Sequence, residues 1–180
     1  CTTMKLKDLF ESTGKSVADL NIDYTDRNDF RCNDFDLTSL EGSPKKVTGL
    51  FDCTENKLTS LEGGPEYVGD SFLCSINQLT SLKGAPKTVY GNFRCTVNQL
   101  TSLKDVHRII HKITGTFYAT QNPIKSHVLG LLLIDDLTDI QIDNKLVQKI
   151  LNKHLGKGRA GMLMAQEGLI EAGLEEFAQL

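Results

Sequence analysis

Four cysteines recur at a constant spacing of 21 residues, each two places after a phenylalanine: Cys32, Cys53, Cys74 and Cys95. Thiols can form disulfides, and four thiolates could hold zinc. Zinc ligands usually come as close pairs such as C-x₂-C, whereas these cysteines come one per repeat and would form a line. Their side chains would run parallel into a core, which suits small apolar groups better than disulfide bridges. We therefore predict buried, reduced thiols, which fit a cytoplasmic protein.

Two other groups have spacings that could support chemistry. His107 and His111 stand four positions apart, as on one face of a helix, but the glutamate of H-E-x-x-H is absent. The basic, glycine-rich stretch from Gly156 to Gly161 could hold an anion at a helix start, but it does not match the Walker pattern. We interpret the histidines as exposed on an inserted helical turn and the glycine stretch as a helix end with its loop.

Nowhere in the chain can a nucleophile with an arranged base be picked out, and the last third has no cysteine. We therefore predict a protein that is not an enzyme, with no catalytic residue, no metal ligand and no cofactor. A metal-dependent enzyme is the least favoured alternative.

The elements that position these residues belong to an internal repeat. Units begin at Phe30, Phe51, Phe72 and Phe93 and share an unchanged L-T-S-L, and a degenerate fifth unit begins at Phe117 after a spacing of 24. A period of this kind indicates a solenoid in which each unit buries its apolar face only against its neighbours. One unit alone would not fold.

Within a unit, V-x-G-x-F-x-C alternates inward and outward positions, which predicts one short half-buried strand stacked in parallel on its neighbours. The leucines of L-T-S-L, such as Leu58 and Leu61, should fill the interior, and Gly-x-Pro should turn the chain back. Asparagines fall where the chain turns and can bond the backbone of their own and the adjacent coil, forming a ladder. The ladder residues are Asn56, Asn77, Asn98 and Asn122.

At this point the repeats resemble the leucine-rich repeat family in its short bacterial type, and most closely in style the leucine-rich repeat proteins encoded by tailed bacteriophages. The match covers about Phe30 to Ile124, with Phe35 in the asparagine place of the first unit and Asp105-Val-His in place of Gly-x-Pro in the fourth. The resemblance implies that the repeats form an arc of short parallel β-strands. It further implies that the protein is located in the host bacterial cytoplasm. It also implies a phage-encoded protein acting on a host macromolecule.

Both flanks of the repeats differ from them and should cap the stack. Residues 1–28 predict an N-terminal cap, with a helix from Met4 to Phe10 followed by an edge segment. We interpret Cys1 to Thr3 as residues added before Met4. Residues 29–125 are the repeats, and 126–180 predict a helical cap or subdomain, with helices over 128–134, 144–155 and 160–180 and an extended link between the first two. Asp143 or Asn144 should cap the second helix, and Gly156 should end it. The predicted fold class is an α/β repeat solenoid.

Composition narrows the classes of partner that the protein is expected to bind. The 180 residues are 39% hydrophobic and carry a net charge of −3, which fits one domain and disfavours nucleic acid, because no broad cationic field is present. No apolar run approaches the ~18 residues that would span a membrane, so we expect a soluble protein without a membrane partner.

Function is predicted on the outward positions of the strands, because each position becomes a row across the coils. These rows vary far more than L-T-S-L and mix apolar, aromatic and arginine side chains, as protein-recognition patches do. We predict a non-enzymatic protein-protein interaction module for host takeover or anti-defence. The alternative is a structural or assembly component of a virion. The C-terminal helices could be a plain cap, a small partner-binding domain or a homo-oligomer contact. The candidate partner-binding residues are Arg31, Leu50, Asp52, Leu73, Asn92, Arg94, Thr116 and Tyr118.

Overall fold

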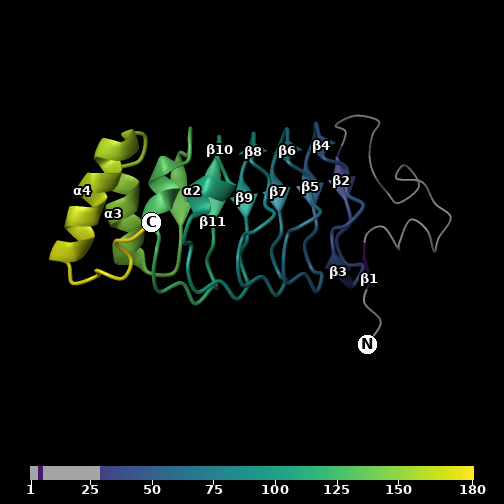
Figure 1. The fold of residues 1–180 in the computed structure, drawn as a ribbon, viewed down its shortest axis with the longest axis horizontal. Coiled ribbons are helices and arrows are strands. Elements are labelled where there is room, and N and C mark those ends of the chain that lie inside the picture. The colour runs from purple at the N-terminus through teal and green to yellow at the C-terminus, as the bar shows by residue number, and fades with distance from the viewer. Residues whose placement is uncertain (1–3, 6–28) are drawn as a thin grey trace.

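The computed structural model describes Met4–Lys5, for which only the backbone is considered, and residues 29–180. It is a solenoid of stacked coils whose long axis runs from the first repeat to the C-terminal helices (Figure 1). The predicted repeat solenoid of parallel strands is confirmed. The predicted N-terminal cap lies outside the described residues, except that Met4–Lys5 is a strand and not the start of a helix. No helix in the described part of the chain is long and apolar enough to cross a membrane.

The coils form two long parallel sheets and one short strand pair. The larger sheet takes one strand from each coil: β2 (Phe30–Arg31), β5 (Phe51–Asp52), β7 (Phe72–Leu73), β9 (Phe93–Arg94), β11 (Thr116–Tyr118) and β12 (Asp139–Gln141). The second sheet contains β4 (Lys46–Val47), β6 (Tyr67–Val68), β8 (Thr88–Val89) and β10 (Lys112–Ile113). The pair joins β1 (Met4–Lys5) to β3 (Leu37–Ser39).

The single strand expected from V-x-G-x-F-x-C is wrong in one respect, because the chain bends inside it. Val47 ends β4 and Phe51 begins β5, and these two strands belong to different sheets. The expected alternation survives the bend, since Val47, Gly49, Phe51 and Cys53 are all buried. The bend needs glycine in the next coil, where a Cβ on Gly69 would lie 2.2 Å from the carbonyl oxygen of Thr48.

The core is a set of columns that run along the stack, as the sequence predicts. Phe30 and Phe51 stack with ring centroids 5.2 Å apart, and the phenylalanine column continues to Phe117. The leucines Leu58 and Leu61 are fully buried behind it. Each coil therefore completes the core of the next, which is why the repeats stabilise one another.

The predicted asparagine ladder is confirmed in detail. The side-chain amide of Asn77 donates to the carbonyl oxygens of Cys53 and Cys74, each at 3.1 Å. Its oxygen accepts the N–H of Leu58 at 3.0 Å. One side chain thus satisfies backbone groups in its own coil and in the preceding coil, all of them buried.

After the fifth repeat the chain keeps to the solenoid before it becomes helical. The expected extended link is β12, which pairs in parallel with β11 and lengthens the larger sheet. The other elements are α2 (Val106–Ile109), the 3₁₀ helix η2 (Leu129–Leu133), α3 (Lys145–Lys153) and α4 (Gly158–Glu171).

Capping explains the limits of the two C-terminal helices. Asn144 caps α3, with its side-chain oxygen accepting the N–H of Val147 at 3.1 Å, whereas Asp143 accepts the N–H of Gln121. The helix expected over 160–180 is too long, because α4 ends at Glu171 before Gly173, whose φ is +75°.

Candidate functional site

The larger sheet presents the predicted interaction residues on one continuous surface, here called the strand face. In the register of the sheet Arg31 lies beside Asp52, Asp52 beside Leu73, Leu73 beside Arg94, and Arg94 beside Tyr118. The five residues from distant parts of the chain therefore form one row, as expected from the alignment of the four regular units and the degenerate fifth. Gln141 on β12 extends the row beyond Tyr118, a residue that sequence reasoning missed because it follows the last recognisable unit.

The two arginines of this row differ in their electrostatic surroundings. Arg31 lies 3.4 Å from Asp29 and 3.5 Å from Asp52, so its charge is largely balanced within the face. Arg94 is exposed, and its guanidinium carbon lies 3.9 Å from the centroid of the Tyr118 ring. No carboxylate among residues 29–180 lies within ion-pair distance of Arg94. The face therefore holds one oriented cation that is free to pair with an acidic group.

The second predicted row, which contains Leu50, Asn92 and Thr116 just before the strand residues of the first row, serves the structure as well as the surface. The side-chain oxygen of Asn92 accepts the N–H of Thr116 at 2.9 Å, and Asp29 accepts the N–H of Leu50 at 2.8 Å. Ser71 makes the equivalent bond to the N–H of Asn92 at 3.0 Å. Three of the row's side chains thus close backbone gaps at the edge of the sheet, which leaves them less freedom to bind a partner.

A third set of exposed residues, missed in the sequence, lies at the turn just after the strands. Ile76 is 45% exposed and Val97 is 37% exposed, and they occupy the same place in neighbouring coils. Both have left-handed backbones, with φ of 55° and 54°. The signal was present in the sequence, because the equivalent residues of the other coils are Asp34, Glu55 and Gln121.

The cysteine row lies in the core, as predicted, and its thiols are free. Cys53, Cys74 and Cys95 each donate a weak hydrogen bond from Sγ to a carbonyl oxygen of the next coil, at 3.3 to 3.4 Å. Burial raises the pKa of Cys53 and Cys74 well above 9.0. Such thiols are poor nucleophiles and poor metal ligands, because both roles need the thiolate.

The histidine pair is only partly as expected. His111 is exposed on the turn after α2, but His107 is half-buried against Gly130 of η2, where a Cβ would lie 2.7 Å from the histidine Nδ1. Burial, and next the charge of Arg108, lower the pKa of His107. Within residues 29–180 no three histidine, cysteine or carboxylate side chains gather as a metal site.

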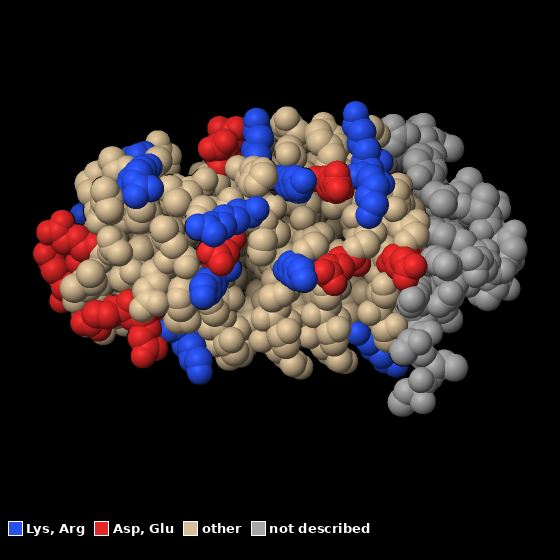
Figure 2. Space-filling view, viewed as in Figure 1, with Lys and Arg blue, Asp and Glu red and all other residues tan. Residues whose placement is uncertain are grey.

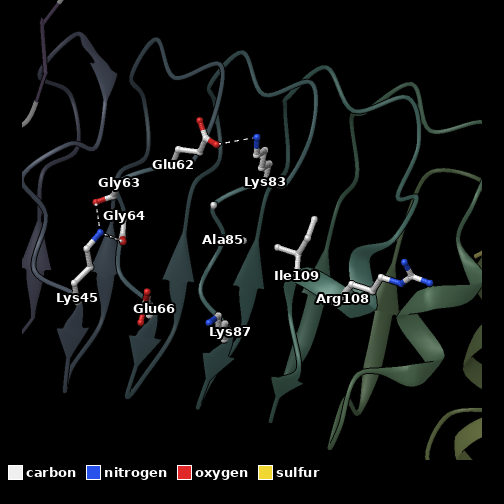
Figure 3. Close-up of a pocket in the computed structure, with 11 residues that line it drawn as sticks. Lys45, Glu62, Gly63, Gly64, Glu66, Lys83, Ala85, Lys87, Arg108 and Ile109 are labelled. Atoms are coloured by element: carbon white, nitrogen blue, oxygen red, sulfur yellow. Dashed lines mark hydrogen bonds and ion pairs between the residues drawn. The ribbon is translucent and has the colours of Figure 1, made fainter.

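A shallow groove of about 340 Å³ lies between the Gly-x-Pro turns and α2. The ammonium of Lys45 donates to the carbonyl oxygens of Gly63 and Gly64, each at 3.3 Å, and Lys83 pairs with Glu62 at 3.0 Å (Figure 3). The guanidinium of Arg108 extends away from the other labelled side chains (Figure 3). These lysine charges are thus engaged with the groove's own groups.

Charges on the face of the molecule seen in Figure 2 are mixed. In the view of Figure 2 basic and acidic side chains alternate across the middle of the solenoid, and acidic side chains gather at the end formed by the C-terminal helices. The stretch from Gly156 to Ala160 is exposed at the start of α4, where Gly156 and Gly158 adopt positive φ. The predicted helix end and loop is thus only partly right, because Gly156 and Lys157 link the two helices whereas Gly158 to Gly161 form the first turn of α4.

Comparisons with protein-family models, curated proteins and solved structures find no match for this chain. The fold itself defines the class: a parallel-strand repeat solenoid with C-terminal helices.

Proposed function

We propose that this solenoid is a non-enzymatic protein-interaction module that binds its partner through the strand face. The observation that carries the proposal is the exposed Arg94 guanidinium stacked on Tyr118 in the row. Stacking restricts the side chain before binding, so less conformational entropy is lost when a partner pairs with it. Arginine and tyrosine are also the residue types that most often anchor protein interfaces.

The rest of the face suits recognition by shape and local contacts. Leu73 lies beside Arg94 and offers apolar contact. Arg31 and Asp52 form an ion pair, so a partner that covers them must offer complementary groups to both charges. Because the strands are locked by core columns and the asparagine ladder, the face is a rigid platform on which these side chains are presented at fixed spacing.

For the partner we propose a bacterial protein, with the chain acting in the cytoplasm as a phage-encoded agent of host takeover or anti-defence. The resemblance of the L-T-S-L repeats to those of phage-encoded proteins supports this source. The mixed signs of charge in the view of Figure 2 support a protein partner over nucleic acid.

The test is affinity capture from infected and from expressing bacteria with the whole chain and three variants. Arg94→Glu reverses the free charge of the face and Tyr118→Ala removes its platform, whereas Lys149→Glu makes an equal charge change on exposed α3. We expect one protein to be retained by the unaltered chain and by Lys149→Glu, and to be lost with the other two. Equal retention by all four chains rejects the strand face. A partner that is a capsid or tail protein, with the chain present in purified virions, supports the assembly role instead.

A further inference from the structure

Ile76 and Val97 form a small surface here called the apolar corner. The two side chains stand side by side, because the N–H of Ile76 donates to the carbonyl oxygen of Thr96 at 3.0 Å in the coil that also carries Val97. Both are β-branched, both are exposed to solvent, and both hold a left-handed backbone conformation. Left-handed geometry disfavours β-branched side chains more than any others, so the two residues are poorly suited to their place.

The stack, not the side chain, imposes this conformation. Every coil repeats it, with φ between 54° and 59° from Asp34 to Gln121, and the N–H of Val97 is tied to Thr120 of the next coil at 3.1 Å. In the flanking coils the position holds Glu55 and Gln121, which are polar and unbranched at Cβ. Apolar β-branched residues at this place therefore cost conformational strain and expose apolar surface, and neither cost serves the fold.

The corner is continuous with the strand face. It follows directly after Ser75 and Thr96, whose hydroxyls are hydrogen-bonded at 2.9 Å across the two coils. Arg94 ends its strand three positions before the turn at Val97, so the Cα atoms of the two residues are at most about 10 Å apart. One side of this surface is therefore apolar, and the other offers an unpaired positive charge.

We propose that the apolar corner and Arg94 together bind an acidic protein segment in extended conformation, with an apolar side chain over Ile76 and Val97 and a carboxylate on Arg94. The inference rests on the proposed function and names the chemistry of the partner at the same face. The free cation selects an acid, and the corner selects an apolar neighbour about three residues away in the segment.

The experiment is selection of peptides from a random dodecapeptide library displayed on yeast, with the whole chain as bait. Affinities of enriched peptides are then measured by fluorescence anisotropy for the unaltered chain, for Arg94→Glu and for the double variant Ile76→Asn with Val97→Asn. Asparagine tolerates the left-handed conformation, so the double variant should fold. The matched control is Glu55→Asn with Gln121→Asn, which changes the same position in the two flanking coils.

We expect enriched peptides to share an aspartate or glutamate and an apolar residue about three places away. Their affinity should fall roughly tenfold or more in Arg94→Glu and in the double variant, as for the loss of a central interface anchor, and stay the same in the control. Peptides that bind the double variant unchanged overturn this inference, and if Arg94→Glu still weakens them the proposed function stands. A library without enrichment also overturns the inference, whereas the proposed function is then decided by the capture experiment.

Discussion

The side-chain oxygen of Asn77 accepts the backbone N–H of Leu58, in the preceding coil, at 3.0 Å. Its amide also donates to the buried carbonyl oxygens of Cys53 and Cys74, each of which accepts a second bond from the asparagine of a neighbouring coil. Removal of this one side chain therefore leaves the buried N–H of Leu58 without its partner and takes one of two bonds from each carbonyl. We expect Asn77→Ala to lower the free energy of unfolding by roughly 2 to 4 kcal/mol, measured by urea denaturation. The exposed Asn33→Ala should change it by no more than about 0.5 kcal/mol. Equal effects would show that the ladder does not stabilise the stack.

Alanine substitutions at two glycines can separate the cost of close approach between coils from the cost of backbone strain. Gly84 has φ +89°, and a Cβ there would lie 2.2 Å from the backbone nitrogen of Glu62, whereas Gly156 has φ +76° with nothing within 4 Å. Gly156→Ala should cost only the strain, about 1 to 2 kcal/mol. Gly84→Ala should lower the melting temperature much further, since neighbouring backbones must move apart. Similar melting temperatures for the two variants would contradict the packing described at the Gly-x-Pro turns.

The cysteine row should make the protein sensitive to alkali. Burial, and next the neighbouring Cys95, raise the pKa of the Cys74 thiol well above 9.0, the ordinary value at which the unfolded chain would ionise. The folded state then keeps a thiol proton that the unfolded state loses at high pH. The contribution of this thiol to the free energy of unfolding is therefore present in full below pH 9.0 and declines as pH rises above it.

Each thiol of the row should contribute a decline of about 1.4 kcal/mol per pH unit above that point. Cys74→Ala removes one such proton, and Ala119 already fills the same place in the fifth coil. The free energy of unfolding measured between pH 8 and pH 10 should therefore fall less steeply for the variant, by about one thiol's share. Parallel curves for the two proteins would show that the thiol is not protected in the fold.

The apolar corner should be a weak point in stability. Replacing Ile76 by asparagine relieves a β-branched side chain in a left-handed backbone and removes exposed apolar surface. We expect Ile76→Asn to raise the free energy of unfolding by about 1 kcal/mol in chemical denaturation. Gln121→Asn, at the equivalent place of another coil, should change it little. A destabilised Ile76→Asn would mean that Ile76 packs into the fold and is not spare surface.

The repeat itself made most of the architecture predictable, because identical packing demands act on Phe51, Cys53, Asn56 and Leu58 in every coil. The bend at Gly49 was not predictable, since inward and outward positions alternate in the same way through one strand or through two that meet at a bend. Strand β12 escaped notice as part of the sheet because Ile140, which pairs with Phe117, lies outside the 21-residue frame.

The rows of the site were predictable from the sequence, but the contacts that each side chain makes within the face were not. The alignment of the fifth unit on Phe117 placed Arg94 beside Tyr118, but only the side-chain geometry shows the guanidinium over the ring. Likewise, Asn92 belongs to the predicted surface, yet its oxygen is already bonded to the N–H of Thr116. The left-handed backbone at Ile76 follows from the stacking of turns, which a one-dimensional pattern does not contain.

The central claim is that the strand face, and not the C-terminal helices, contacts the partner. Its most direct test is photo-crosslinking in expressing bacteria with p-benzoylphenylalanine placed either at Tyr118 on β11 or at Leu146, which is 52% exposed on α3. Irradiation should give a covalent adduct with one cellular protein from position 118 and none from position 146. An adduct from position 146 without one from position 118 would contradict the account and assign binding to the helical end.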